Sequence, residues 1–295
     1  MNGFLNLLKP PGMSSGAAVA VIKRLTGERT GHAGTLDPEA AGVLPVMIGR
    51  ATRLLDYFTD HSKSYAAEIA FSGATDTQDA QGTLTEAAAR TPEKAEIEAA
   101  LAAFRGTILQ RPPAYSALKK DGVPLYRLAR AGQAVETQAR ETEIRALTLG
   151  EKTGGGGYML YVDCGGGTYI RTLCHDIGQA LHAPAHMRFL LRTRHGKFDI
   201  QTAVTVEEAL AAAESGSLEK LLLPLDFPLR ELPALHAPPA YWKAARNGAK
   251  LPLTLMPDLM EGRRCRVYAG GTLCGVAKRS EGMLRFEVGL IGGEG

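Results

Sequence analysis

The 295-residue sequence lacks the features that mark several large classes of protein. No apolar run approaches the roughly 18 residues of a membrane-spanning helix, so we expect no membrane segment. The first residues, MNGFLNLLKPPG, have no basic n-region and reach Lys-Pro-Pro too early for a signal peptide. With 45% hydrophobic and 22% charged residues, the composition is that of an ordinary soluble globular protein. We therefore expect a cytoplasmic protein.

Cysteine is scarce, and the common cofactor motifs are missing. The four cysteines form no Cys-x-x-Cys pair and have no histidine at zinc-finger spacing, so free, mostly buried thiols are expected, although the sequence leaves a zinc site or a disulfide open; they are Cys164, Cys174, Cys265 and Cys274. Neither G-x-x-x-x-G-K-[ST] nor G-x-G-x-x-G occurs in a strand–helix frame. The sequence thus gives no motif for a metal, a nucleotide or a redox cofactor.

The net charge of +3 does not by itself indicate a nucleic-acid partner, but the distribution of charge does. Residues 105–130 carry six basic side chains against Asp121, a local charge of +5. Residues 182–197 carry four basic side chains and no acid, whereas residues 201–232 carry six acids and two bases. This pattern favours a protein with one face for phosphates, with solvated charge runs as the alternative.

Hydrophobic periodicity predicts strands at 4–8, 65–71 and 158–164. It also predicts three helices. The first is capped by Ser14 or Ser15 and ends at Gly27, the second begins at Thr91-Pro92, and the third follows the glycine turn 165–167 with Thr168 as its N-cap. A glycine-rich turn that leads into a helix can cradle a phosphate, which leaves a phosphate-binding metabolic enzyme as one hypothesis.

The composition changes after about residue 225, where prolines become frequent. Three short strand-like runs follow near 264–268, 272–277 and 283–288, separated by Ala-Gly-Gly and Ser-Glu-Gly turns. The length of the chain also suggests one large domain and one small one. We therefore expect a small β module at the C-terminal end.

The segment 31–45, GHAGTLDPEAAGVLP, places Asp37 among three glycines and two prolines, with Glu39 as the other carboxylate. It is too broken for a helix and too irregular for a long strand. Gly34 and Gly42 allow positive φ or a close backbone approach, and Pro38 biases Asp37 toward an extended backbone. Loops with a fixed backbone often carry catalytic groups, although Asp-Pro and glycine are also common in ordinary turns.

This segment resembles the catalytic loop of the TruB family of pseudouridine synthases, which modify the T-loop of tRNA. Four further blocks extend the resemblance over nearly the whole chain: LLKPPGMSS (7–15), KSYAAEIAFSGATDTQDAQG (63–82), RPPAYSALKKDGVPLYRLAR (111–130), and GGTYIRTLCHDIGQAL (166–181) with HMRFLLRTRHGKF (186–198). Ala33 stands where many members have threonine, which does not touch the catalytic group. The resemblance implies that Asp37 is the catalytic aspartate and that the pocket is completed by Tyr65, Tyr169, Arg171 and Leu190.

The resemblance also implies an α/β fold of the α+β type. It has a mixed, mainly antiparallel central sheet with flanking helices, and a small C-terminal β-rich domain that is PUA-like. Residues 1–225 would form the catalytic domain, with an RNA-binding insertion at about 83–135. Residues 232–295 would form the RNA-binding C-terminal domain.

The implied reaction converts a uridine of the tRNA T-arm, position 55, to pseudouridine, and it needs no metal or other cofactor. Asp37 must be ionised to act, and Arg171 beside it would lower the carboxylate pKa and orient it. The base would be flipped from its stack, at a cost of roughly a few kcal/mol, with His32 entering the vacated space. Lys9, Lys119, Lys120, Arg192 and Arg194 are candidates for contacts with the RNA backbone.

We expect a monomer with tRNA as its partner and no membrane association. A non-catalytic RNA-binding or tRNA-folding protein on the same scaffold is the main rival. Asp37 together with Tyr65 and Arg171 argues against it, because a binding protein has no need of these three.

Overall fold

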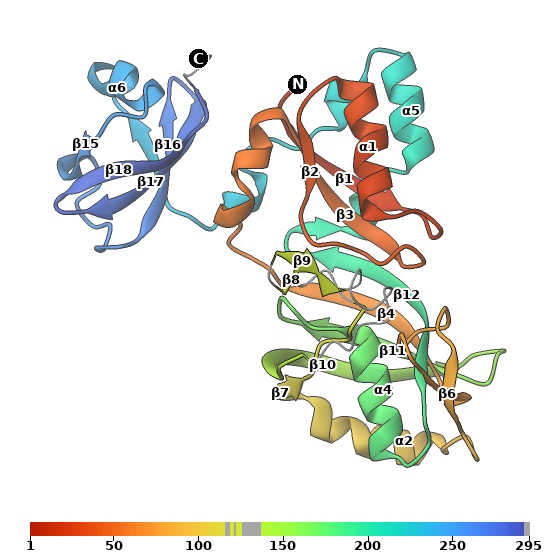
Figure 1. Cartoon of the computed structure of the whole chain (residues 1–295). Coiled ribbons are helices and arrows are strands. Elements are labelled where there is room, and N and C mark those ends of the chain that lie inside the picture. The colour runs from red at the N-terminus through yellow and green to blue at the C-terminus, as the bar shows by residue number, and fades with distance from the viewer. Residues whose placement is uncertain (116–118, 121, 126–136, 292–295) are drawn as a thin grey trace.

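The structure, a computed structural model of the chain, describes residues 1–115, 119–120, 122–125 and 137–291 (Figure 1). A nine-stranded sheet runs through the larger part of the molecule in the order β1-β3-β12-β4-β11-β10-β7, with β2 paired to β3 and β13 to β12. These strands are β1 (Gly3–Lys9), β2 (Thr30–His32), β3 (Ala41–Ile48), β4 (Lys63–Ala70), β7 (Gly106–Gln110), β10 (Arg140–Lys152), β11 (Tyr158–Cys164), β12 (His186–His195) and β13 (Phe198–Asp199).

All neighbours in this sheet are antiparallel except β3 and β12. A mixed, mainly antiparallel sheet is therefore confirmed. Four helices pack on it and share one hydrophobic core with its strands; they are α1 (Ser15–Thr26), α2 (Lys94–Leu101), α4 (Ile170–Ala180) and α5 (Val206–Glu214). The described residues of this part also form two short hairpins, β5 (Gly73–Thr75) with β6 (Leu84–Ala87), and β8 (Lys119–Lys120) with β9 (Val123–Pro124).

A second sheet, of five strands, lies beside the N-terminal part of the first (Figure 1). Its order is β14-β16-β17-β18-β15, and the short helix α6 (Trp242–Arg246) packs on it; the strands are β14 (Ala234–Ala237), β15 (Leu251–Pro252), β16 (Arg264–Ala269), β17 (Thr272–Ser280) and β18 (Met283–Gly289). The C-terminal β module is confirmed, and its limits, 232–295, stay a prediction. A core cluster containing Phe4, Phe198, Leu273 and Val276 joins the two sheets.

The local predictions were right for the first helix and wrong for the starts of the other two. Ser14 caps α1, and Gly27 ends it in the left-handed conformation with φ of 68°. The second helix begins at Lys94, because Glu93 and Glu96 form a capping box there. Thr168 is not the cap of α4, which begins at Ile170 after Tyr169. The hydroxyl of Thr168 instead bonds to Thr142 and to the carbonyl of Gly165.

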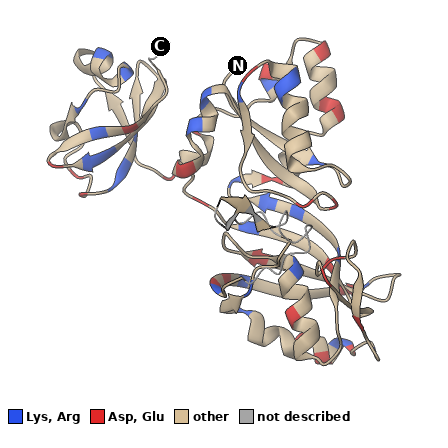
Figure 2. Cartoon of the chain, in the orientation of Figure 1, with Lys and Arg blue, Asp and Glu red and all other residues tan. Residues whose placement is uncertain are grey.

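The segment 31–45 is more regular than predicted, because its last five residues belong to β3, an eight-residue strand that includes Pro45. The four cysteines are free and buried, as expected. None of the helices in the described ranges has the length and apolar character of a membrane span. Figure 2 shows acidic residues on α5 and basic residues on β12 and on the strands of the second sheet.

Candidate active site

The loop between β2 and β3 carries Asp37, and side chains from the N-terminal segment hold it in place. The Ser15 hydroxyl donates to the carbonyl of Leu36 and accepts from its N–H, both at 2.9 Å. The Lys9 ammonium donates to the carbonyls of Pro38, Met13 and Pro10 at 3.0, 2.6 and 2.8 Å. These bonds fix the backbone on both sides of Asp37.

Lys9 is fully buried, with 0% of its surface exposed. Burial lowers the pKa of Lys9 to about 8, while the nearby Glu39 and Asp37 favour its charged form. The prediction that Lys9 contacts an RNA phosphate is wrong, because its ammonium faces backbone carbonyls inside the protein. It anchors the loop instead.

Arg192 holds the same loop from the side of β12. It is 1% exposed, and its guanidinium donates to the carbonyls of Val43, Gly34 and Thr35 at 2.8, 2.8 and 3.4 Å. β12 approaches β3 closely here, since a Cβ at Gly42 (φ 118°) would lie 2.2 Å from the Arg192 carbonyl oxygen. The prediction that Arg192 contacts an RNA phosphate is therefore also wrong, because no donor of its side chain reaches the surface.

Arg171, in the first turn of α4, contacts both carboxylate oxygens of Asp37. The Nε–Oδ2 distance is 2.9 Å and the Nη2–Oδ1 distance is 3.2 Å. Arg171 also donates to the carbonyls of Thr77 and Tyr115 at 3.2 and 2.9 Å. Its side chain is 6% exposed, whereas 40% of the Asp37 side chain remains open to solvent. The buried guanidinium thus presents one carboxylate to a pocket.

Burial raises the pKa of Asp37 above its ordinary value. Arg171 acts in the opposite direction, and Asp79 adds to the rise. The expectation that Arg171 lowers the pKa is right for the pair interaction, but the net direction is upward because desolvation is the larger effect. The result is a carboxylate more basic than an exposed aspartate.

Asp79 is a member of this cluster that the sequence reasoning missed. Its Oδ2 lies 3.8 Å from Nη1 of Arg171, and its Oδ1 accepts from the Thr77 hydroxyl at 2.6 Å. Arg171 therefore lies between two carboxylates. The motif block 63–82 contains Asp79, but no spacing rule relates it to Arg171, which is 92 positions further on.

A cavity of about 300 Å³ opens beside Asp37. Its wall unites the five residues predicted for the pocket, Asp37, Tyr65, Tyr169, Arg171 and Leu190. It also includes Lys63, Thr168, Ile170 and the glycines 34 and 167, among others. Tyr65 is buried in β4, and burial raises its pKa to about 12. The pocket thus combines a basic carboxylate, a fixed cation and a neutral phenol.

The backbone of Tyr169, just before α4, is clamped by the buried side chain of Gln110 at the end of β7. Gln110 Oε1 accepts from the Tyr169 N–H at 3.0 Å, and Gln110 Nε2 donates to its carbonyl at 3.2 Å. The clamp places α4, and with it Arg171, against the pocket. Across the described residues, no three His, Cys, Asp or Glu side chains are grouped so as to hold a metal ion.

Comparison with known proteins relates the chain to a family. The model of the "TruB family pseudouridylate synthase (N terminal domain)" matches residues 23–170, which include the Asp37 loop, Tyr65 and Tyr169. The chain belongs to the TruB family. A second model, the "tRNA pseudouridylate synthase B C-terminal domain", matches residues 171–230.

Curated TruB relatives match over most of the chain. Proteins named tRNA pseudouridine synthase B from Pelotomaculum thermopropionicum and Burkholderia lata are 41% and 40% identical, covering 94% and 97% of this chain and 91% and 89% of their own. Among solved structures, a chain of a Cbf5-Nop10-Gar1 complex matches with a TM-score of 0.74 and 27% identity, covering 98% of this chain and 85% of that one. The pseudouridine synthase fold is therefore shown.

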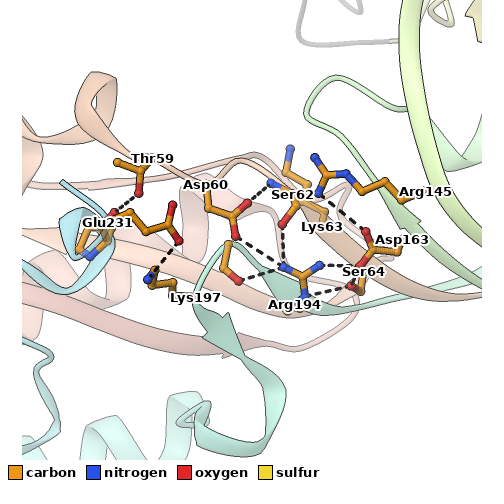
Figure 3. Close-up of polar contacts among 12 residues, drawn as sticks. Thr59, Asp60, Ser62, Lys63, Ser64, Arg145, Asp163, Arg194, Lys197 and Glu231 are labelled. Carbon is orange, nitrogen blue, oxygen red and sulfur yellow. Dashed lines mark hydrogen bonds and ion pairs between the residues drawn. The ribbon is translucent and has the colours of Figure 1, made fainter. Parts of the chain in front are cut away.

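Two further predicted residues of this TruB protein, His32 and Arg194, lie outside the pocket wall. His32 lies in β2, and burial and the nearby Arg192 lower its pKa, which favours a neutral ring. Arg194 lies between Asp163 and Asp60, at 2.6 and 3.8 Å, and also bonds to Ser62 (Figure 3). It stays a candidate for RNA contact only if these bonds rearrange. The side chains of Lys119 and Lys120 lie outside the described part of the chain.

Proposed function

We propose that this enzyme converts uridine 55 in the T-loop of tRNA to pseudouridine, with Asp37 as the catalytic residue. The observation that carries the proposal is the two-point contact of Arg171 with Asp37 at the edge of a pocket lined by Tyr65 and Tyr169. The relatives named tRNA pseudouridine synthase B support tRNA as the substrate. A structural neighbour, an H/ACA RNP bound to a substrate RNA containing 2′-deoxyuridine, supports an RNA uridine as the reacting group (TM-score 0.73, 25% identity).

The reaction breaks the N1–C1′ bond, turns the uracil and joins C5 to C1′. The proton on C5 is lost and N1 gains one, so no oxidant, reductant or energy source enters the balance. The step needs an ionised carboxylate as nucleophile or base, and a raised pKa makes Asp37 stronger in either role. Arg171 keeps that carboxylate ionised and fixes its direction.

Tyr65 and Tyr169 bring two aromatic rings to the pocket, which suits the planar face of a uracil. Because Tyr65 keeps its proton at neutral pH, its hydroxyl can donate to the substrate or pass a proton on. The target base has to leave its stack to reach Asp37, as in other enzymes that act on a base. We assign an RNA-binding role to the C-terminal β module, which is PUA-like and carries basic side chains on β16–β18 (Figure 2).

The test uses an unmodified tRNA transcript and the purified protein. Pseudouridine is mapped by base-specific chemical labelling and primer extension before and after incubation. The expected result is one new pseudouridine at position 55, and none when that uridine is replaced by cytidine. Pseudouridine at another position alone, or at no position, would contradict the assignment.

A further inference from the structure

Lys63, the first residue of β4, lines the catalytic pocket together with Tyr65, Thr168 and Gly167. Residues 63 and 65 lie on the same face of the strand, because side chains alternate along it. Lys63 pairs with His195 of β12 on one side and with Cys164 of β11 on the other. The strand therefore directs its side chain to the face that carries the catalytic group.

The ammonium of Lys63 has no counter-charge within the described ranges, where it makes no ion pair and no hydrogen bond. Two acids drawn with Lys63 in Figure 3, Asp163 and Asp60, are engaged by other partners. Asp163 binds Arg194 at 2.6 Å and accepts from Ser64 at 2.9 Å. Asp60 accepts from the N–H of Ser62 at 2.8 Å.

The third nearby carboxylate, Asp37, is held by Arg171. Burial and the positive charge of Arg192 together lower the pKa of Lys63, the direction expected for an unpaired cation withdrawn from water. Withdrawing an unpaired charge from water costs free energy in the free protein. An anion that enters the pocket offsets this cost.

The glycine turn 165–167 provides the space for that anion. Gly167 lines the same pocket, and a Cβ built on it would meet no atom within 4 Å. A glycine-rich turn that leads into a helix, as this one does, can cradle a phosphate. Its position next to Lys63 ties it to the RNA substrate, because phosphates are the anionic groups of RNA and the usual partners of lysine in RNA complexes.

We propose that Lys63 and the open turn at Gly167 form a phosphate subsite that binds a phosphodiester flanking the target uridine. The contact places the ribose of the flipped nucleotide against Asp37. The proposal rests on the proposed function, since it takes RNA as the substrate. It makes Lys63 a substrate-binding residue of the pocket.

The test is a binding cycle between protein and RNA. T-arm hairpins carrying one uncharged methylphosphonate, either 5′ or 3′ of the target uridine, are compared with the unmodified hairpin. Their Kd values are measured for the parent, Lys63→Met and Lys63→Arg. Lys220→Met, an exposed lysine in the acidic stretch 201–232, is the matched control. Turnover is measured separately on the unmodified hairpin.

Lys63→Met should weaken binding of the unmodified hairpin about tenfold, the loss of one charge-assisted bond. It should also reduce the slope of log Kd against log salt by about 0.7. One methylphosphonate should weaken binding to the parent by a similar factor and leave binding to Lys63→Met unchanged. Lys63→Arg should retain most of the affinity, and Lys220→Met should behave as the parent.

Equal losses from the methylphosphonates in the parent and in Lys63→Met would overturn the subsite. A large fall in the melting temperature of Lys63→Met would also overturn it, because removal of an unpaired, desolvated charge should not destabilise the fold. Failure of the parent to form pseudouridine would instead contradict the proposed function. The binding cycle would still report on the phosphate contact.

Discussion

Arg171 meets Asp37 edge-on, with Nε 2.9 Å from Oδ2 and Nη2 3.2 Å from Oδ1. This fork matches the geometry of a carboxylate, which an ammonium cannot reproduce. Arg171 is itself fixed by the carbonyls of Thr77 and Tyr115. Asp37 is therefore aimed by a side chain that has little freedom of its own.

Replacement of Arg171 should change the pH dependence of the reaction. Burial already raises the pKa of Asp37, and Arg171 opposes the rise, so its loss should raise the pKa further. The ionised fraction then falls at a given pH, and the acid limb of the pH–rate profile of Arg171→Ala should move up by about one to three units. Arg171→Lys should recover part of the shift. A profile that superimposes on the parent's would contradict the pairing.

Tyr65→Phe should lower kcat by about 10²–10⁴-fold and leave KM nearly unchanged, if the hydroxyl serves in proton transfer. Because burial raises the pKa of Tyr65 to about 12, the parent should show no downturn from this group near pH 10, about the ordinary tyrosine value. Steady-state kinetics across pH test both points. If kcat were unchanged in Tyr65→Phe, the hydroxyl would have no role in proton transfer and the ring would contribute packing only.

Lys9→Met should loosen the Asp37 loop. The change leaves the carbonyls of Pro38, Met13 and Pro10 without their shared donor, at a cost of about 1.5–3 kcal/mol for a charged hydrogen bond. We expect a lower melting temperature and a lower kcat, both measured against Lys23→Met, an exposed lysine of α1. A melting temperature equal to that of this control would mean that the bonds do not stabilise the loop.

Lys119 and Lys120 remain predicted contacts with the RNA backbone. Their joint replacement by alanine should weaken tRNA binding and flatten its salt dependence by about 0.7–0.9 for each lost phosphate contact. Binding isotherms over a range of salt concentrations measure both effects. An unaltered slope would remove these lysines from the interface.

The sequence predicted what depends on local chemistry. Ser14 and Gly27 mark the two ends of α1, because a capping side chain and a left-handed glycine each interact with residues of the adjacent helical turn. The start of α4 was misplaced, because the side chain of Gln110, 59 positions earlier, holds Tyr169 where the helix begins. No local pattern contains that contact.

The site residues were predicted through motifs, and the errors concern burial. Lys9 lies in a turn-forming segment, and Arg192 lies in a basic one. The sequence alone does not show whether such a basic side chain is buried or exposed. Their positions depend on carbonyls supplied by other segments, such as Val43 for Arg192. The upward shift of the Asp37 pKa has the same origin, since desolvation depends on the assembled pocket.

The central claim is that the charge of Asp37 drives the isomerisation of uridine 55. The most direct measurement is single-turnover pseudouridine formation at that position by the parent and by Asp37→Asn, with tRNA binding measured in parallel. The amide keeps the shape of the side chain but cannot ionise. We predict that pseudouridine formation is abolished while tRNA still binds, and near-parental formation by Asp37→Asn would contradict the account.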